Sequence, residues 1–451
     1  MDIEGYVKSS LEKGYEKEDI IENLTNIILE YKDILSDQSE KISKCVYDEV
    51  KTTSSITSDE YELLTYPATE LGMGEFGVGS RGQGDFYVHG KIADIIKNTS
   101  TNSIVNPTAQ DDGGVVKVDD TYYITTAIDG IHSRLSNYPF LAGFHTARAT
   151  LRDVCVMGAD PVALISDIHL ADDGDIGKLL DYTAGICAVS ELTGVPLVSG
   201  STLRIGGDMV LGDRFVGAVG AVGSSENMPK ARSEAKEGDV ILMTEGSGGG
   251  TITTTSIYNN YPDVIMETLN VQFIEASHLL LEYPNQEDIH AMTDITNGGI
   301  NGDANEINKT TGLGIHLYKD KINGLINSKV YEMLDNLGID PLGVSIDSLM
   351  IITSEDAKDK IIKLLRSNNI RIDVIGKVTD TGKTYIEESN GSVEVLTPKF
   401  REAAYTPIKK VIEEIHNIDF DKDKEKIDKA TLESINKKNR IVDLIRNRYE
   451  Q

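Results

Sequence analysis

The feature that most constrains this chain is a pair of adjacent carboxylates, Asp111 and Asp112, followed at once by two glycines. Two neighbouring acids at a glycine turn repel each other unless a cation lies against them. The sequence then predicts a strand over 115–118, a tight turn at 119–120 and a returning strand over 121–128. The segment is therefore expected to form a β-hairpin with acids at its open end.

The turn determines which residues of this hairpin face each other. With a two-residue turn, Asp112 is expected opposite Ala127, and Asp129 follows two residues later on the same strand. Because side chains alternate with a period of two, Asp112 and Asp129 should share one face, roughly 7–8 Å apart on the diagonal. That spacing suits Mg²⁺, which takes carboxylate oxygens and keeps substrate phosphates as other ligands. Solvated acids on an exposed hairpin are the alternative.

A third carboxylate follows on a predicted helix over about 139–158, which has proline at its start, an apolar stripe and glycine at its end. At about 100° per residue, His145, Arg148 and Arg152 fall on one face, with Asp153 at its edge. Cations beside an acidic cluster fit a polyphosphate ligand. Charge pairs on an exposed helix are the alternative, but the hairpin and helix together favour a binding site.

A glycine-rich segment precedes the hairpin. Residues 72–85 contain six glycines, including Gly79 and Gly82, with Arg81 between these two. Glycines let backbone amides approach an anion closely, so the segment is a candidate phosphate loop. It lacks the Lys-Ser/Thr pair of a Walker A loop, and a flexible loop is the alternative.

Composition narrows the range of partners. The 451-residue chain carries a formal net charge of −29, which argues against binding to nucleic acid or to an anionic membrane. No long apolar run and no signal peptide are apparent, and three scattered cysteines favour a reducing compartment. A cytoplasmic protein is therefore expected.

The chain is too long for one compact core, and its pattern divides it into four parts. Residues 1–58 are predicted to form a helical extension with an amphipathic stripe, and residues 400–451 a second, highly charged helical extension. Between them, alternating strands and helices indicate an α/β domain over 59–225 and a second domain over 226–399.

The order of motifs along the chain carries a resemblance to a known family. The motifs are DDGG, TTAIDGIH, RATLRDVCVMGADP, a glycine–threonine turn, AKEGDVILMTEG and AMTDITNGG. Over about residues 70–380 the chain resembles the PurM-like, or AIR synthase-related, superfamily. Its members include aminoimidazole ribonucleotide synthetase, thiamine-monophosphate kinase, selenophosphate synthetase and the hydrogenase-maturation dehydratase. The chain looks closest to an archaeal branch from which no particular reaction can be carried over.

The resemblance implies a two-domain PurM-like subunit. Its N-terminal α/β domain would hold a four-stranded sheet that joins the sheet of a second subunit in a barrel, and its C-terminal domain would be α+β. It also implies a homodimer that uses ATP and Mg²⁺ and acts on a small, phosphorylated metabolite. The implied enzyme is a phosphotransferase, or a ligase or cyclase that activates an oxygen of its substrate.

The site residues follow from these motifs and from the resemblance. Asp111 and Asp112 match the acidic Mg–ATP pair of the family, and Asp294 with its paired glycines matches a motif of the second domain. The residues assigned to catalysis are Asp294, His132 and Arg152. Those assigned to the nucleotide are Gly79, Arg81, Gly82, Asp111, Asp112, Asp129, Arg148, Gly200, Thr202, Gly298 and Gly299. Those assigned to metal are Asp111, Asp112, Asp129 and Asp153.

Two departures from the family pattern leave alternatives open. Ser201 stands where relatives carry an acid, and Asp208 and Asp213 are candidate replacements. The glycine-rich segment lacks the lysine, cysteine or selenocysteine that selenophosphate synthesis requires, which argues against that reaction. A nucleotide-binding regulatory or scaffold protein without turnover is therefore the alternative to an enzyme.

Overall fold

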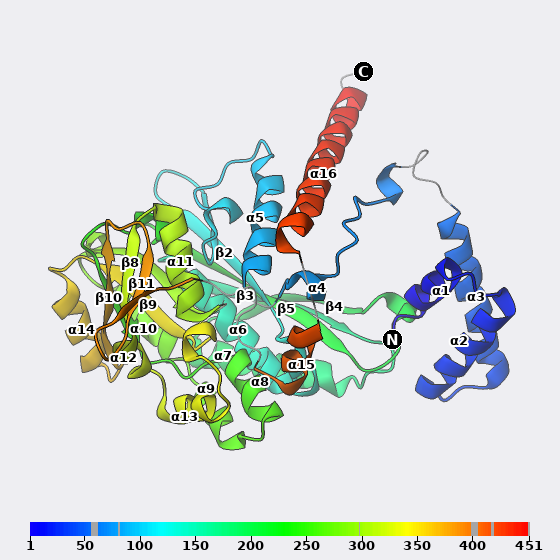
Figure 1. The fold of residues 1–451 in the computed structure, drawn as a ribbon, viewed down its shortest axis with the longest axis horizontal. Helices are drawn as coiled ribbons and strands as arrows, with labels where there is room; N and C mark the ends of the chain where they lie inside the picture. The colour runs from blue at the N-terminus through cyan, green and yellow to red at the C-terminus, as the bar shows by residue number, and fades with distance from the viewer. Residues whose placement is uncertain (56–61, 80–81, 297, 398–404, 416–418, 450–451) are drawn as a thin grey trace.

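The strands of the chain form two separate sheets, one on each side of the segment near residue 226 (Figure 1). The computed structural model describes residues 1–55, 62–79, 82–296, 298–397, 405–415 and 419–449. An α/β unit is followed by an α+β unit, with helices at both termini, so the predicted fold class is confirmed.

The first sheet has five strands rather than the four that the resemblance implies, because a short hairpin strand is added at one edge. In spatial order its strands are β1 (Gly114–Lys117), β2 (Tyr123–Gly130), β5 (Phe215–Ser225), β3 (Asp160–Leu170) and β4 (Leu197–Arg204). Only β3 and β4 pair in parallel.

The hairpin between β1 and β2 differs from the prediction in its turn. The Asp119 carboxylate accepts hydrogen bonds from the backbone amides of Thr121 and Tyr122, at 2.7 and 2.9 Å, and this side-chain turn lengthens the loop to three residues. The predicted two-residue turn, and with it the pairing of Asp112 with Ala127, is therefore wrong by one residue. Asp112 lies before the first residue of β1, so the alternation of the strand does not set its direction.

Two helices, α6 (Pro139–Val156) and α7 (Gly177–Thr193), cover the inner face of this sheet. They approach closely because Gly143 faces the backbone of α7, where an added Cβ would lie 2.1 Å from the carbonyl oxygen of Tyr182. The core beneath them buries the side chains of Leu151 and Phe215 completely.

The outer face of the first sheet carries apolar side chains that are exposed in a single chain. Ile128 near the end of β2 is 70% exposed. Its apolar neighbours on the same face, each at least 42% exposed, are Val116, Ile165, Leu203 and Val216. The described part of one chain therefore leaves this face uncovered.

The second sheet has seven strands, and its central strands are continuous apolar runs because helices pack on both faces. In spatial order the strands are β12 (Val393–Val395), β11 (Thr384–Glu387), β8 (Gly314–Tyr318), β10 (Ile372–Thr379), β6 (Val240–Thr244), β9 (Ser348–Thr353) and β7 (Ile289–Ile295). The helices are α8 (Gly250–Tyr258), α9 (Ile265–Thr268), α10 (Gln272–Leu281), α11 (Gly299–Thr311), α12 (Lys319–Asn323), α13 (Ser328–Asn336) and α14 (Lys358–Ser367).

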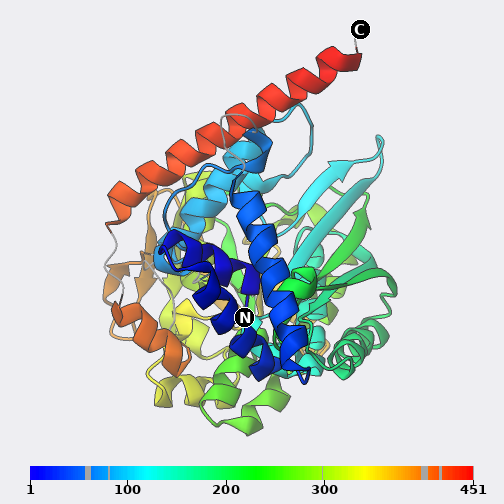
Figure 2. The ribbon, with the colours of Figure 1, turned by 90° about the vertical axis from the view of Figure 1, so that its right-hand side faces the viewer.

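The N-terminal helices α1 (Ile3–Glu12), α2 (Lys17–Tyr31) and α3 (Ser36–Ser54) share a small core of their own. They lie beside the first sheet (Figures 1 and 2), where Leu211 of the β4–β5 connection joins their core. The ammonium group of Lys32 lies 2.6 Å from Asp173 and also contacts Asp172.

The C-terminal helix α16 (Phe420–Tyr449) lies along α5 (Gln83–Lys97), although more than 300 residues separate the two in the sequence (Figures 1 and 2). The ring of Phe420 stacks on Phe76, in the short helix α4 (Met73–Phe76), at 5.3 Å between centroids. The hydroxyl of Tyr87 donates to Asp428 at 2.5 Å. A shorter helix, α15 (Pro407–Ile415), precedes α16.

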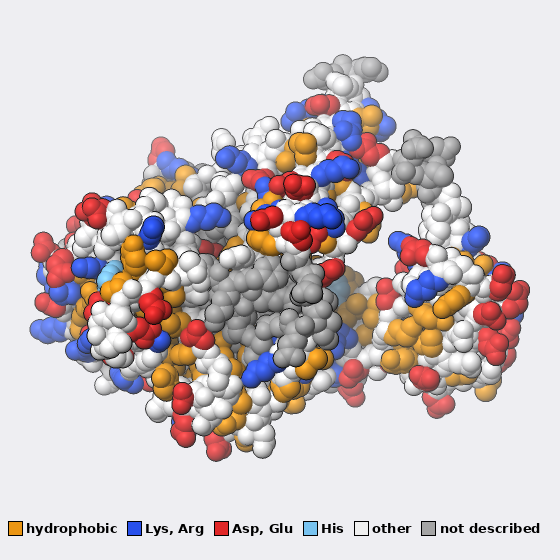
Figure 3. Space-filling view, viewed as in Figure 1, with side chains coloured by type: hydrophobic (Ala, Val, Ile, Leu, Met, Phe, Trp, Pro, Cys, Tyr) orange, Lys and Arg blue, Asp and Glu red, His pale blue; other side chains and the backbone are white. Residues whose placement is uncertain are grey.

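Charged side chains of both signs are interspersed over the face of the molecule seen in Figure 3. None of the helices described is both long enough and apolar enough to cross a lipid bilayer.

Candidate active site

A cavity of about 800 Å³ lies where the two units meet. The acid turn before β1, the end of β2 and the helix α6 line it from the first unit, and β7, α8 and α11 line it from the second. The segment from α4 to α5 forms a further wall, through Met73, Phe86 and Ile92.

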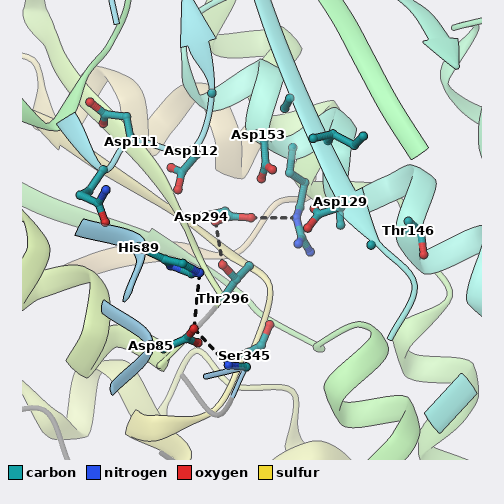
Figure 4. Close-up of a pocket in the computed structure, with 18 of the residues that line it drawn as sticks. Asp85, His89, Asp111, Asp112, Asp129, Thr146, Asp153, Asp294, Thr296 and Ser345 are labelled. Carbon is teal, nitrogen blue, oxygen red and sulfur yellow. Dashed lines mark hydrogen bonds and ion pairs between the residues drawn. The ribbon is translucent and has the colours of Figure 1, made fainter. Parts of the chain in front are cut away.

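Four acids that the sequence singled out converge on this cavity. Asp112 comes from the acid turn, Asp129 from the end of β2, Asp153 from α6 and Asp294 from β7. Figure 4 shows their carboxylates directed toward the same space. The structure therefore brings together residues from both units, including Asp294, which lies about 140 residues or more along the chain from the others.

Acids strongly outnumber cations around the cavity. Only two guanidinium groups, those of Arg152 and Arg232, belong to its described lining. The nine carboxyl side chains of that lining are Asp85, Asp111, Asp112, Asp129, Asp153, Asp294, Asp303, Glu306 and Asp347. A polyanionic ligand can enter such a space only together with cations.

Several carboxyl groups of the cavity have raised pKa values, as expected for buried acids that lie close to one another. Burial raises the pKa of Asp153 well above its usual range, and the Asp129 and Asp294 carboxylates raise it further. Burial also raises the pKa of Asp294 to about 7, although Arg152 opposes the shift. The pKa of Asp111 rises to about 6 through burial, against the opposing effect of Arg232. A bound cation would relieve the repulsion that these shifts express.

The carboxylates of the cavity provide donor atoms that suit a magnesium ion. The Oδ2 atoms of Asp111 and Asp303 are buried and have no hydrogen-bond partner, so carboxylate oxygens are available. No three His, Cys, Asp or Glu side chains in the described chain are arranged to hold one ion. This fits Mg²⁺, which commonly uses one or two carboxylates and completes its shell with water and phosphate. The assignment of individual metal ligands stays a prediction.

Arg232, which the sequence reading did not single out, lies at the centre of the acids. It begins the turn η5 (Arg232–Glu234) in the connection between the two units. Its Nη2 atom lies 2.7 Å from both Asp112 Oδ1 and Thr293 Oγ1, and its Nη1 atom lies 3.1 Å from Glu306 Oε2. Burial lowers the pKa of Arg232, but Asp112, Glu306 and Asp303 outweigh that effect and raise it. Arg232 is therefore a permanent cation that joins the two units.

Arg152 and Arg148 share a second buried acid, Asp347. The Nε atom of Arg152 lies 3.2 Å from Asp294 Oδ2, and its Nη1 atom contacts Asp347. Burial would raise the pKa of Asp347, but the two arginines lower it well below its usual range. Asp347 therefore pairs with both arginines, whereas Asp294 pairs, among the described residues, only with Arg152, whose effect does not outweigh the burial of Asp294.

Arg148 lies behind the cavity wall rather than in its described lining. Its guanidinium donates to the backbone carbonyls of Gly248, Thr268 and Asn270 at 2.6–2.9 Å, and to Asp347 at 2.5 Å. These contacts tie α6 to the second unit. Its Nε atom is buried without a hydrogen-bond partner in the described part of the chain, and the contact between Arg148 and phosphate stays a prediction.

Two histidines line the cavity near α8. Both ring nitrogens of His132 meet hydroxyl groups, Nδ1 that of Thr254 at 2.9 Å and Nε2 that of Tyr405 at 2.8 Å. His145 meets Thr253 at 2.8 Å through Nε2, and burial lowers its pKa well below the usual range. His145 is therefore neutral, and both ring nitrogens of His132 are already hydrogen-bonded to protein hydroxyl groups.

The glycine-rich segment contributes to the cavity only in part. Gly79 lines it and donates its backbone amide to Asp85 at 3.1 Å, while His89 lies 3.4 Å from the same carboxylate (Figure 4). Gly82 caps the start of α5 and is not part of the lining. Arg81 lies outside the described residues.

Four other residues that the sequence assigned to the nucleotide do not belong to the described lining of the cavity. Gly200 and Thr202 lie on the exposed edge strand β4 and do not line the cavity of their own chain. Gly298 and Gly299 form the turn into α11, both with positive φ, and a Cβ on Gly299 would lie 2.3 Å from the carbonyl oxygen of Leu342. The positive φ favours glycine at both positions and packing requires it at Gly299, while their contact with a nucleotide stays a prediction.

The acids proposed to replace the one missing at Ser201 also lie outside the cavity. Asp208 pairs with Arg204, and Asp213 pairs with Lys178 at 2.7 Å. Neither residue lines the described cavity, and nor does Ser201 on β4, so the replacement stays a prediction.

Sequence signals existed for some of the missed residues. Asp303 shares one face of α11 with the buried Ile300 and Ile307, and an acid within an apolar stripe suggests a buried partner. Asp347 immediately precedes the fully buried strand β9. Arg232 carries no such signal, because it lies in an irregular connection.

Both units of the chain are similar in sequence to known proteins. Residues 110–223 match the N-terminal domain of AIR synthase related proteins, and residues 236–388 match the C-terminal domain. The chain is 52% identical to Uncharacterized protein MJ1416 of Methanocaldococcus jannaschii over the full length of both. It is 26% identical to the thiamine-monophosphate kinase of the same organism, over 65% of this chain and 94% of the kinase.

A solved structure has a similar fold. Hydrogenase maturation protein HypE in complex with ATP gives a TM-score of 0.52 at 18% identity. The match covers 72% of this chain and 93% of the HypE chain.

Proposed function

Since the chain belongs to the AIR synthase-related family, as its motifs predicted, we propose that it is an ATP- and Mg²⁺-dependent enzyme. It transfers phosphate to a small metabolite, or activates an oxygen of that metabolite, in the cavity between its two units. A relative named as a kinase and a relative solved with ATP support this assignment.

The observation that carries the proposal is the convergence of Asp112, Asp129, Asp153 and Asp294 on one cavity with few cations. Phosphoryl transfer needs mainly positioning and neutralisation of charge. A buried excess of carboxylates from two units supplies binding positions for cations that accompany a triphosphate. The volume of about 800 Å³ is in the range of small-molecule sites.

The residues present define the roles in this proposal. Asp112, Asp129 and Asp153 would provide carboxylates for Mg²⁺, one or two to each ion, and the bound ions would neutralise the negative charge of phosphate oxygens. Asp294 faces the same space from the second unit, so it orients the acceptor relative to the nucleotide. Arg152 keeps Asp294 in place through the 3.2 Å ion pair and is itself held by Asp347.

The experiment that tests the proposal measures ATP binding and turnover together. Calorimetry with ATP is performed in Mg²⁺ and in EDTA, and ADP formation is followed with a panel of small phosphorylated metabolites. The proposal expects Mg²⁺-dependent binding and ADP release that one class of metabolite accelerates. Binding that is the same in EDTA would overturn the metal assignment.

A nucleotide-binding protein without turnover is the second candidate. It is favoured by the engagement of Arg148 and Arg152, whose guanidinium groups already meet protein carboxylates or carbonyls. In that case the same measurements give Mg²⁺-dependent binding with no ADP formed under any condition of the panel.

A further inference from the structure

Tyr405 links the C-terminal segment of the chain to the wall of the cavity. It lies just before α15 and beyond residue 388, where the match to the family ends. Its side chain is only 6% exposed and belongs to the core of the second unit. A residue outside the shared domains therefore reaches the candidate active site.

Three hydrogen bonds form a row that runs from Lys409 through Tyr405 and His132 to Thr254. The Lys409 ammonium donates to the Tyr405 hydroxyl at 3.1 Å and also lies 4.3 Å from the centre of its ring. The Tyr405 hydroxyl lies 2.8 Å from His132 Nε2, and His132 Nδ1 lies 2.9 Å from Thr254 Oγ1. His132 itself lines the cavity.

The chemistry of these groups gives the row a direction. An ammonium group can only donate, so the Tyr405 oxygen accepts from Lys409. Among the described residues, Lys409 and His132 are the two groups hydrogen-bonded to the Tyr405 hydroxyl, and of these only the Nε2 atom of a neutral His132 can accept its proton. A neutral imidazole has one donor and one acceptor nitrogen, so its proton lies on Nδ1 and is donated to Thr254.

We propose that Tyr405 is a positioning residue of the candidate active site, which holds His132 in the form protonated on Nδ1 and fixes the orientation of its ring. The C-terminal segment thereby controls one wall of the cavity. The proposal rests on the proposed function only in treating this cavity as the site of reaction, because the state of His132 can be measured without turnover.

The test uses nitrogen-15 NMR of the full-length protein labelled at histidine. The signals of His132 among the eight histidines are identified by their loss in His132→Gln. In the wild-type protein we expect Nδ1 to be protonated and Nε2 unprotonated. In Tyr405→Phe, which keeps the buried ring, we expect Nε2 to lose its donor and the two forms to mix.

Two lysines of α15 provide a second variant and its matched control. Lys409→Met removes the donor to Tyr405 and should shift the His132 signals in the same direction, but less. Lys410→Met removes a lysine that instead donates to the Leu337 carbonyl at 3.3 Å, and should leave them unchanged. A wild-type His132 protonated on Nε2, or a Tyr405→Phe spectrum identical to wild type, would overturn the proposal.

A kinetic measurement separates this inference from the proposed function. If ADP is formed, Tyr405→Phe should lower the turnover number several-fold while the KM for ATP stays within twofold. Equal turnover in the two proteins would contradict the positioning role. If the wild-type protein forms no ADP, the proposed turnover fails, whereas the NMR result still decides the role of Tyr405.

Discussion

The Arg232 guanidinium and the Asp112 carboxylate lie 2.7 Å apart, and through this contact the connection between the two units holds the acid turn in place. The same guanidinium reaches Asp303 and Glu306 on α11. One buried cation therefore neutralises acids from both sides of the cavity, and the cavity depends on it for its shape.

Removing this cation should destabilise the protein strongly. Arg232→Met leaves several buried carboxylates without a partner, and breaking a buried ion pair in this way costs about 3–5 kcal/mol. The free energy of unfolding is measured by urea titration. Arg204→Met is the matched control, because Arg204 is 55% exposed and solvent screens its ion pairs, so its loss should be far smaller. Equal losses in the two variants would show that Arg232 is not a central cation.

Asp112→Asn should weaken the binding of ATP in the presence of Mg²⁺ by about tenfold or more, equivalent to about 1.4 kcal/mol. The substitution keeps the shape of the side chain but removes a charge that faces the metal. Calorimetry in Mg²⁺ and in EDTA separates the metal-dependent part. Asp208→Asn serves as the control, since Asp208 lies outside the cavity and pairs with Arg204. The metal argument fails if Asp112→Asn and the wild-type protein bind ATP equally in Mg²⁺.

Asp294→Ala should reduce turnover far more than it reduces the affinity for ATP. Asp294 enters the cavity from the second unit, so its proposed role is to complete the reactive geometry and not to anchor the nucleotide. The turnover number is compared with the calorimetric Kd for ATP. A loss of ATP affinity as large as the loss of turnover would place Asp294 in the nucleotide site instead.

The metal-free protein should become less stable as pH rises from about 5 to 8. Folding raises the pKa of Asp111 to about 6 and those of Asp294 and Glu306 to about 7, each chiefly through burial. Unfolded carboxyl groups have lost their protons by about pH 5, so the folded state binds more protons in this window and loses stability as they leave.

Two other buried groups with shifted pKa values do not reverse the sign of this slope. The pKa of Asp347 is lowered, so its contribution to stability is constant above about pH 4 and does not enter the slope. His145, whose pKa burial lowers, gives an opposite slope that is smaller than that of the three acids together. Thermal unfolding in EDTA measures the trend, and Glu306→Gln should flatten it. A stability that increases between pH 5 and 8 would contradict this account.

The exposed outer face of the first sheet predicts a homodimer. Its apolar residues include Ile128, which is 70% exposed, and a second copy of the same face would cover them. Light scattering should give about twice the 49.3 kDa mass of one chain. Ile128→Glu should give the monomer, whereas Leu192→Glu on the exposed side of α7 should not. A wild-type monomer would count against this arrangement.

The sequence predicted the acids of the site better than their cations. Asp129, Asp153 and Asp294 were found because each follows from a local pattern, at the end of a strand or within a helix. Asp112 lies in the same cavity as these acids, although the side-chain turn at Asp119 shifts the hairpin register from the predicted one. Periodicity and glycine turns are local properties, so they can be recognised in the sequence without knowledge of the fold.

The partners of these acids depend on contacts between distant segments. Arg232, Asp347 and Tyr405 meet the site only after the two units and the C-terminal segment have packed together. Arg148 lay on the predicted face of its helix, yet the second unit supplies enough carbonyl oxygens to engage it. Such pairings cannot be derived from spacing along the chain.

The position of α16 against α5 has a consequence for the order of folding during synthesis. Asp112, Asp129, Asp153 and Asp294 all precede Phe420 and Asp428 by more than 120 residues. Because chains emerge from the ribosome N-terminus first, the contacts of α16 with α4 and α5 form only after the segments that carry these acids have emerged. The cavity wall formed by α4 and α5 is therefore the last to gain its tertiary contacts.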